Sequence, residues 1–291
     1  NSLVCWEIQE YGSEEQKERW LPAMSRLEKI GAFGLSEPLR GSDAVHVLTE
    51  AQRDGDEYIL NGAKRWIGNA SIADLLIIWA RDDEGKFGGF VIEDPNNTPG
   101  VTTKNIQGKI SKRAVLNADI TLENVRIPAE NRLAHTSSFR DTSKVLAYTR
   151  YSICWEAAGI AAACLELALD YAKTREQFDR PIAGFQLVQQ KLVEMAADVT
   201  QMQLLCFRMG ELMERGELTS AQISMGKYNN ARKARQVAML ARETLGGNGI
   251  LIENHIARLM LDAEVIYTYE GTNEINMMIV GRELTGIGAF V

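Results

Sequence analysis

The clearest hydrophobic pattern in the chain is a series of apolar positions spaced alternately four and three residues apart. The series is Val188, Leu192, Met195, Val199, Met202, Cys206, Met209 and Met213. This spacing predicts a helix whose apolar seam packs inside a bundle. The methionines could instead form a ligand surface, but core packing is the more typical use of such a stripe. Helices are also predicted from Asp141 to about Glu176 and from about Thr219 to Leu245, where Gly246-Gly247 would end the helix.

Between Phe33 and about Pro128 the pattern changes to short strands. Leu75 to Ala80 has the length of a buried strand, and Ala118 to Pro128 alternates between apolar and polar residues. The pairs Asp54-Gly55 and Asn61-Gly62 are typical turn dipeptides, so turns are expected at both. Several short strands with frequent turn signals predict a small sandwich or barrel.

The beginning of the chain is again helical in character. Ser13-Glu14-Glu15-Gln16 has the form of a capping box, and Trp20 and Leu21 supply an apolar face. The chain starts at Asn1 without a methionine, as though it were cut from a longer protein, and its first residues do not resemble a signal peptide, so none is expected there. Helices, then strands, then helices indicate a multi-domain α+β chain.

Composition and charge exclude several classes of function. The formal net charge of -7 argues against a nucleic-acid or anionic-membrane partner. No continuous apolar run reaches the ~18 residues of a transmembrane segment. The histidines are scattered, and the cysteines form no group with metal-ligand spacing, so no metal site is expected. Buried free thiols in a reducing compartment are the expected state of the cysteines, which are Cys5, Cys154, Cys164 and Cys206.

A lone carboxylate near the end of the chain is the strongest candidate for chemistry. Glu270 stands between Tyr269 and Gly271, just before a predicted helix for which Thr272 is a plausible N-cap. A glutamate at such a junction can be shielded from water, which raises its pKa towards the range a general base needs. The alternative is a first-turn acid that the helix dipole favours.

The glycine-rich stretch Gly246-Gly247-Asn248-Gly249 resembles part of a nucleotide-binding fingerprint. It follows a predicted helix rather than a strand, so a Rossmann interpretation fails on context. Such a turn could still let backbone N–H groups approach a phosphate closely.

Taken together, several motifs resemble the acyl-CoA dehydrogenase family of flavoproteins. They are Phe33-Gly34-Leu35-Ser36-Glu37-Pro38 with Gly41-Ser42-Asp43, Lys64-Arg65-Trp66-Ile67-Gly68-Asn69, Arg175-Glu176-Gln177-Phe178, Phe185-Gln186, Leu245-Gly246-Gly247-Asn248-Gly249 and Tyr269-Glu270-Gly271-Thr272. The ending Val280 to Ile287 looks most like the glutaryl-CoA dehydrogenase branch, which also includes similar short-chain acyl-CoA oxidases. The resemblance implies three domains: a remnant of an N-terminal helical domain (1–31), a middle β-barrel (32–135) and a C-terminal four-helix bundle (136–291).

The resemblance also implies an activity. Glu270 matches the base that removes the α-proton of an acyl-CoA thioester, and its N–H would help to polarise the thioester carbonyl. The β-hydrogen leaves as a hydride to flavin N5, and the product is a trans-2-enoyl-CoA. The implied cofactor is FAD, the implied assembly is a homotetramer, and the implied electron acceptor is an electron-transfer flavoprotein, or O2 if the protein is an oxidase.

The protein would lie in the cytoplasm of a prokaryote or in the mitochondrial matrix, or in the peroxisome if it is an oxidase. A helical interaction module without chemistry is the non-enzymatic alternative.

Site residues are carried over from the family by position. Those implied to contact FAD are Phe33, Leu35, Ser36, Trp66, Ile67, Gly68, Arg175, Phe178, Gln186, Glu243, Gly246, Gly247, Thr272, Glu274 and Phe290. Those implied to lie beside the substrate are Ser42, Ser143, Arg150, Tyr269 and Gly271. In the family, Arg175 and Gln186 reach the FAD of a neighbouring subunit, where an arginine fork suits a pyrophosphate.

Departures from the family pattern bear on the acceptor and the substrate. Asp179 replaces a common glycine, and Glu243 and Glu274 are acidic where several relatives carry glutamine. Gly68 replaces the hydroxyl residue that usually meets flavin N5, so it leaves open an oxidase, although glycine can also serve only a tight backbone path. The arginine that recognises a dicarboxylic substrate in the glutaryl branch would lie upstream of Ser2, so the acyl group also stays open.

Overall fold

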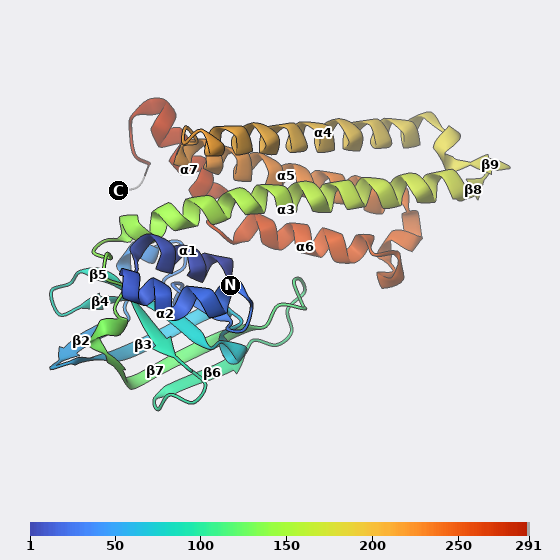
Figure 1. The fold of residues 1–291 in the computed structure, drawn as a ribbon. Coiled ribbons are helices and arrows are strands. Elements are labelled where there is room, and N and C mark those ends of the chain that lie inside the picture. Colours follow the sequence, from blue (N-terminus) through green and yellow to red (C-terminus); the bar gives the residue numbers. More distant parts are fainter. Residues whose placement is uncertain (290–291) are drawn as a thin grey trace. The chain divides into compact units, whose positions relative to one another are not determined.

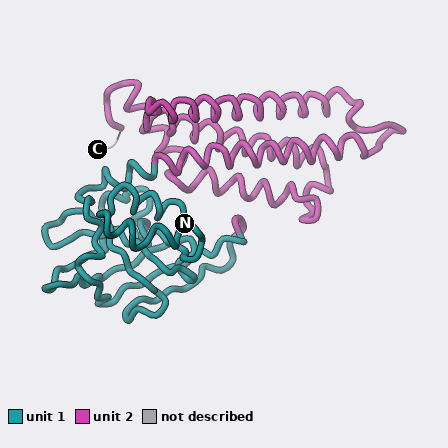
Figure 2. The backbone as a smooth tube through the Cα atoms, in the orientation of Figure 1, with its two compact units in different colours: residues 1–109, 113–146 teal, residues 110–112, 147–291 magenta. Residues whose placement is uncertain are grey.

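The computed structural model describes residues 1–289 (Figure 1). Within it the chain separates into two compact units, drawn in teal and magenta in Figure 2. The first unit holds residues 1–109 and 113–146, and the second holds residues 110–112 and the chain from 147 onward. The expected division into three domains stays a prediction.

The first unit opens with two helices that cover one face of a sheet. Helix α1 (Ser2–Tyr11) is followed by α2 (Glu14–Ser25). The predicted capping box is confirmed: the N–H of Gln16 donates to Ser13 Oγ at 3.3 Å, and the N–H of Ser13 donates to Gln16 Oε1 at 2.9 Å. Trp20 of α2 is fully buried in a cluster that contains alternate residues of strand β4.

The sheet of the first unit has seven strands. They are β1 (Gly31–Gly34), β2 (Glu50–Asp54), β3 (Glu57–Gly68), β4 (Leu75–Asp82), β5 (Phe87–Glu93), β6 (Val101–Asn105) and β7 (Asn117–Pro128). The order is β1-β4-β2-β3-β7-β6, with β5 paired to β4, and β4 pairs in parallel with both β1 and β2. The predicted barrel is therefore a curled half-barrel, in which the described part of β6 pairs with β7 alone.

Strand β4 explains why this sheet needs cover on both faces. Leu75, Ile77 and Trp79 pack in the cluster under the helices. Leu76 and Ile78 point to the opposite face and pack with residues of β3 and β7 inside the curl. A strand buried on both faces has the continuous apolar run seen in the sequence.

One predicted turn is wrong. Asp54-Gly55 does form the turn between β2 and β3, and Gly55 has a φ of 60°. Asn61-Gly62 instead lies inside β3, at a register shift between Leu60 and Gly62. Gly62 has a φ of 146°, and a Cβ there would come within 2.8 Å of the Cα of Thr49. The glycine therefore serves a bulge that lets a neighbouring backbone approach, and bulges use glycine for this reason.

The second unit is a helical bundle. Its helices are α3 (Phe139–Thr174, from residue 147 on), α4 (Gln186–Glu214), α5 (Ser220–Thr244), α6 (Ile256–Thr268) and α7 (Asn273–Thr285). Two short strands, β8 (Glu176–Gln177) and β9 (Arg180–Pro181), form a hairpin between α3 and α4. The 3-10 turns of the molecule are η1 (Ala44–His46), η2 (Ala70–Ile72), η3 (Ala129–Asn131), η4 (Ile182–Gly184), η5 (Gly246–Ile250) and η6 (Ile252–Asn254).

The predicted seam of α4 is confirmed as the bundle core. Its central members Met195, Val199, Met202, Cys206 and Met209 are buried. Small residues of α3 and α5, mainly alanines, face them, which lets the helices approach closely. The cysteines are free thiols, as expected, and three of them are buried.

Helix α3 is long and apolar enough to cross a membrane by length and composition alone. An 18-residue window within it has a mean hydropathy of 1.5, which a search for continuous apolar runs does not detect. Within the bundle, however, Cys154, Ala157, Ala161 and Cys164 of this helix are buried in the core cluster, as in a core helix.

Candidate active site

Glu270 lies in a short turn between α6 and α7. Helix α7 begins at Asn273, and its N-cap Thr272 accepts a hydrogen bond from the N–H of Ile275 at 3.2 Å. Glu270 thus precedes the N-cap by two residues, and Glu274 takes the place of the first-turn acid. The alternative of a first-turn acid is therefore wrong for Glu270.

The turn has an unusual backbone. Glu270 has a φ of 55° and Gly271 a φ of 80°, so two successive residues adopt the left-handed conformation. Gly271 tolerates this readily, but for a glutamate it costs about 1–2 kcal/mol. Strain of this kind persists where the surroundings fix it, and it is frequent at active sites.

Side chains from three helices hold this turn through its carbonyl groups. Arg150 Nε of α3 donates to the carbonyl of Glu270 at 2.9 Å. Lys227 Nζ of α5 donates to the carbonyl of Gly271 at 2.8 Å, and Asn276 Nδ2 of α7 donates to the same oxygen, also at 2.8 Å. The N–H of Glu270 has no partner within the described part of the chain, so it can donate to a bound group.

The carboxylate itself is held in a poorly hydrated position. Thr149 Oγ1 donates to Glu270 Oε2 at 3.1 Å. Burial raises the pKa of Glu270 above its ordinary value, while Arg150, Thr149 and Lys227 act to lower it. A carboxyl group tuned in this direction suits proton abstraction at neutral pH.

Two residues that the resemblance places beside the substrate have contacts within the second unit. Arg150 binds the Glu270 carbonyl and also donates to Ser224 Oγ at 3.3 Å, and burial lowers its pKa. The Tyr269 hydroxyl donates to Glu156, which also pairs with Lys112. Their contacts with substrate stay predictions, as does that of Gly271.

The sequence interpretation missed Lys227, Thr149 and Asn276. A signal for Lys227 exists: it recurs at helical spacing with Ala231, Ala234 and Ala238, which are all buried in the bundle core. A lysine within an apolar stripe indicates a buried cation with a specific partner.

A second cluster gathers four of the residues expected to contact FAD. Arg175, Glu243, Gly246 and Gly247 line a surface cavity of about 350 Å³ together with Tyr171, Gln177, Ile182, Thr244, Leu245 and Asn248. Arg175 makes no ion pair within the described residues. A Cβ on either glycine would meet nothing within 4 Å, so both leave the cavity open. A free guanidinium beside bare backbone fits a pyrophosphate or another anionic group.

The other expected FAD residues of the second unit lie in the β8–β9 turn, at the start of α4, and at the N-cap and first turn of α7. Phe178 is 87% exposed at the β8–β9 turn, and Gln186 is the first residue of α4. The Thr272 hydroxyl serves as the cap of α7, and Glu274 accepts a hydrogen bond from the Tyr267 hydroxyl at 3.2 Å. Phe290 lies outside the described residues.

In the first unit, the residues expected to line the flavin occupy β1 and the end of β3. Phe33 lies in β1, and Leu35 and Ser36 follow it. The Ser36 carbonyl accepts a hydrogen bond from the N–H of Arg65 at 2.8 Å, which ties the segment after β1 to β3. Trp66 has a φ of 66° at a second register shift of β3, and it is 53% exposed. An exposed tryptophan on a strained bulge is consistent with a ligand contact. Ile67 is buried, and Ser42 and Ser143 are exposed.

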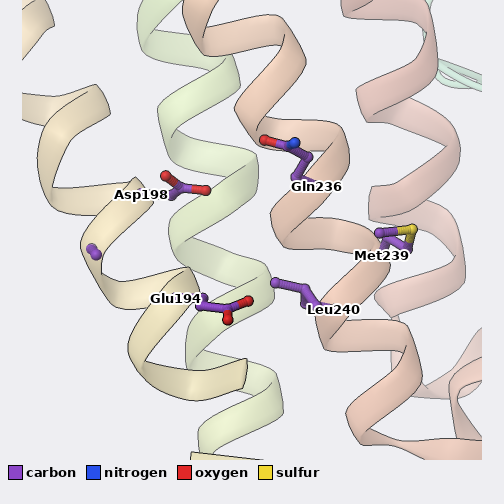
Figure 3. A pocket seen from close by; sticks show the side chains of 6 residues that line it. Glu194, Asp198, Gln236, Met239 and Leu240 are labelled. Carbon is purple, nitrogen blue, oxygen red and sulfur yellow. The ribbon is translucent and has the colours of Figure 1, made fainter. Parts of the chain in front are cut away.

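A second cavity, of about 360 Å³, lies between α4 and α5 (Figure 3). Its lining includes the carboxylates of Glu194 and Asp198 and the side chains of Gln236 and Met239. Asp198 is paired with Lys233. None of the expected site residues lies in it, and its acidic lining does not suit an anionic thioester.

Comparisons with known proteins cover nearly the whole chain. Family models for the acyl-CoA dehydrogenase N-terminal, middle and C-terminal domains match residues 1–28, 32–125 and 139–285. Glutaryl-CoA dehydrogenase of Desulfococcus multivorans is 35% identical over 98% of this chain and 75% of its own. A solved glutaryl-CoA dehydrogenase from Mycobacterium smegmatis has a TM-score of 0.97 at 45% identity, over 100% of this chain and 74% of that one. A second such structure from Mycobacterium smegmatis, in complex with FADH2, has a TM-score of 0.96 at 39% identity, over 100% and 75%.

Proposed function

Because this chain belongs to the acyl-CoA dehydrogenase family of FAD-dependent oxidoreductases, which act on the CH–CH group of acyl-CoA, we propose that it oxidises a short-chain or dicarboxylic acyl-CoA with Glu270 as the base. The observation that carries the proposal is the left-handed turn at Glu270, which Arg150 and Lys227 hold by its carbonyl groups. A single desolvated carboxylate fixed in this way is what α-proton removal requires.

The proposed role of the chain is to take one proton and to stabilise one oxyanion. Glu270 accepts the α-proton of the thioester, and its own N–H, which is free in the described chain, donates to the thioester oxygen as negative charge develops there. Arg150 and Lys227 place positive charge next to the turn, which also favours the developing anion. Bound FAD supplies the acceptor for the β-hydrogen, which leaves as a hydride.

The residues that would hold FAD fall into separate groups on this chain. The cavity beside Arg175, Gly246 and Gly247 suits the pyrophosphate and nucleotide part, and the exposed face of Trp66 suits an aromatic ring. The first group serves the cofactor of a neighbouring subunit in the proposed homotetramer. The electron acceptor that we propose is an electron-transfer flavoprotein.

The likeness to glutaryl-CoA dehydrogenases favours a dicarboxylic substrate. The described residues around Glu270, however, act on the thioester end of the acyl group and do not select for a carboxylate at its other end. We therefore propose the wider class of short or dicarboxylic acyl-CoA. Turnover of glutaryl-CoA against butyryl-CoA, with CO2 release measured, distinguishes the two members of this class.

The test of the base is Glu270→Gln, which keeps the shape of the side chain and removes its basicity. We expect the variant to retain FAD and acyl-CoA binding and to lose activity by ~10²–10⁴-fold or more, because the turn between α6 and α7 contains no second carboxylate. Stopped-flow reduction of the bound flavin by butyryl-CoA or glutaryl-CoA measures this directly. Reduction at the wild-type rate would show that another group removes the proton.

One observation supports an oxidase as a second candidate. Gly68 has an ordinary φ, and a Cβ there would approach no atom closer than 3.9 Å. The backbone at this position therefore does not require glycine. This argues against the alternative that Gly68 serves only a tight path of the chain. A glycine kept where a side chain fits leaves space that O2 can use beside a bound flavin.

A further inference from the structure

Lys227 is a fully buried cation without a carboxylate partner in the described structure. Lys227 is 0% exposed. Among the described residues, its ammonium group forms no salt bridge with an acidic side chain. Burying an unpaired ammonium costs several kcal/mol even after relaxation. A fold that retains such a group at this cost uses it for something other than stability.

The hydrogen bonds of Lys227 all lead to the chain around Glu270. Nζ donates to the carbonyl of Tyr267 at 3.2 Å, to the carbonyl of Gly271 at 2.8 Å and to Asn273 Oδ1 at 3.4 Å. Tyr267 lies in the last turn of α6, Gly271 in the turn itself, and Asn273 at the start of α7. One ammonium group therefore joins the three segments that determine the path of the chain at Glu270.

We propose that Lys227 is a positioning residue for Glu270, which fixes the left-handed turn between α6 and α7 and so sets the place of the carboxylate. The inference rests on the proposed role of Glu270 as the base. Lys227 differs from Arg150 and Asn276 in its contacts. Those two residues bind the turn, but their hydrogen bonds do not reach the end of α6.

Removing these bonds frees the end of α6 to shift against the turn. A displacement of about 1 Å at a reacting group can cost 10²-fold in rate. Because the carboxylate acts in the chemical step, we expect the loss in kcat, with little change in KM.

The charge of Lys227 adds a second, separable effect. Arg150 and Cys154 on α3, Glu270 in the turn and Glu274 on α7 are the titratable groups that face the ammonium. Its positive charge opposes the rise that burial causes in the pKa of Glu270. Without it the pKa of Glu270 rises further, so the acidic limb of the kcat profile moves to higher pH.

The experiment compares two variants of the FAD-loaded, assembled protein. Lys227→Met removes both the charge and the donor at nearly the same length, and Lys227→Gln removes the charge but keeps a donor. Lys233→Met is the matched control, because Lys233 lies on the same helix and pairs with Asp198 away from the turn. The probes are butyryl-CoA and glutaryl-CoA, and each variant is assayed for kcat, KM, pH profile, FAD absorbance and Tm.

We expect Lys227→Met to lose roughly 10- to 100-fold in kcat, with wild-type FAD content and the shifted acidic limb. Lys227→Gln should recover part of the rate but keep the shift, and Lys233→Met should match the wild type. A Lys227→Met enzyme with wild-type kcat and pH profile overturns the inference, and so does a rate loss that follows FAD loss and a lowered Tm in proportion. If Lys227→Met does not assemble, the same criteria apply to Lys227→Gln.

The Glu270→Gln variant separates this inference from the proposed base. Wild-type activity of Glu270→Gln would refute the proposed base. An inactive Glu270→Gln together with a fully active Lys227→Met would refute only the role of Lys227.

Discussion

At the scale of single residues, the buried charged side chains of the first unit differ in how fully they are hydrogen-bonded. Lys64 and Glu37 form a fully buried ion pair at 2.9 Å, and Thr49 donates both its N–H and its hydroxyl to the same carboxylate. Glu7 of α1 is less well matched. It accepts a hydrogen bond from the Thr142 hydroxyl at 2.8 Å, but its Oε2 has no partner within the described residues. Burial raises the pKa of Glu7 to about 8, so at neutral pH the folded chain keeps this carboxyl protonated.

Glu7 should make stability depend on pH. Its ordinary pKa is 4.5, so between 4.5 and about 8 the unfolded chain is ionised while the folded chain holds the proton. The folded state binds more protons in this window, and its free energy of unfolding therefore falls as pH rises through it. Glu7→Gln keeps the hydrogen bond without ionising, so we expect it to be more stable than the wild type at pH 8 and similar at pH 4.5.

Urea unfolding across this range measures the effect, and Glu10→Gln on the same helix is the control, since Glu10 pairs with Lys144 near the surface. Parallel slopes for Glu7→Gln and the wild type would contradict the assignment of the raised pKa.

At the scale of elements, strand β3 shows where local sequence signals reach their limit. Asn61-Gly62 is a turn dipeptide, yet here it forms a bulge, because the partner strand β7 continues past it and Thr49 approaches the glycine. Trp66 sits at a second register shift with a positive φ that no neighbouring residue type indicates. Both features depend on strand pairing, which joins residues about 60 positions apart and is not encoded in a short window.

The end of β3 also carries a prediction about oxygen. Gly68→Thr should fold normally, because the nearest atoms to a Cβ are Val115 Cγ1 and Asn117 Nδ2 at 3.9 Å. If the glycine admits O2, the substrate-reduced flavin of the wild type should reoxidise measurably faster in air than that of the variant, with peroxide formed. Stopped-flow reoxidation checks this, with Gly159→Thr at an exposed position of α3 as the control. Equal and slow reoxidation in both proteins would leave only the dehydrogenase.

At the scale of the whole molecule, the elements were more predictable than their chemistry. The alternating spacing of apolar residues in α4 and the apolar run of β4 were enough to predict a helix and a strand, because each pattern of burial suits one type of secondary structure. The sequence located Glu270 just before a helix capped by Thr272, and the structure confirms that position. Lys227 could not be assigned to this turn from the sequence, since its contact with Gly271 joins residues 44 positions apart. Long-range polar contacts of this kind leave only a weak local trace.

Assembly gives a prediction at the same scale. Arg175→Ala removes the guanidinium from the cavity beside Gly246 and Gly247, so we expect weaker FAD retention through the loss of a charge-assisted contact. Because the proposed contact crosses subunits, retention should also fall on dilution of the oligomer. FAD absorbance after gel filtration at several protein concentrations measures both effects, and Arg208→Ala on α4, which removes only a surface pair with Glu211, is the control. A monomer that retained FAD as tightly as the oligomer would exclude the contact across subunits.

The way the Glu270 turn is held also has a consequence for biosynthesis. Its supports enter the chain in the order Arg150, Lys227 and finally Asn276, six residues after Glu270, the proposed base. A ribosome that stops before α7 releases a chain that already contains most of the bundle core but lacks the last support and the cap at Thr272. Such a fragment contains the core residues of α3 to α6, but its turn at Glu270 is not held by Asn276. Synthesis from the N-terminus therefore leaves the turn at Glu270, the proposed base, without its full set of supports until α7 has been made.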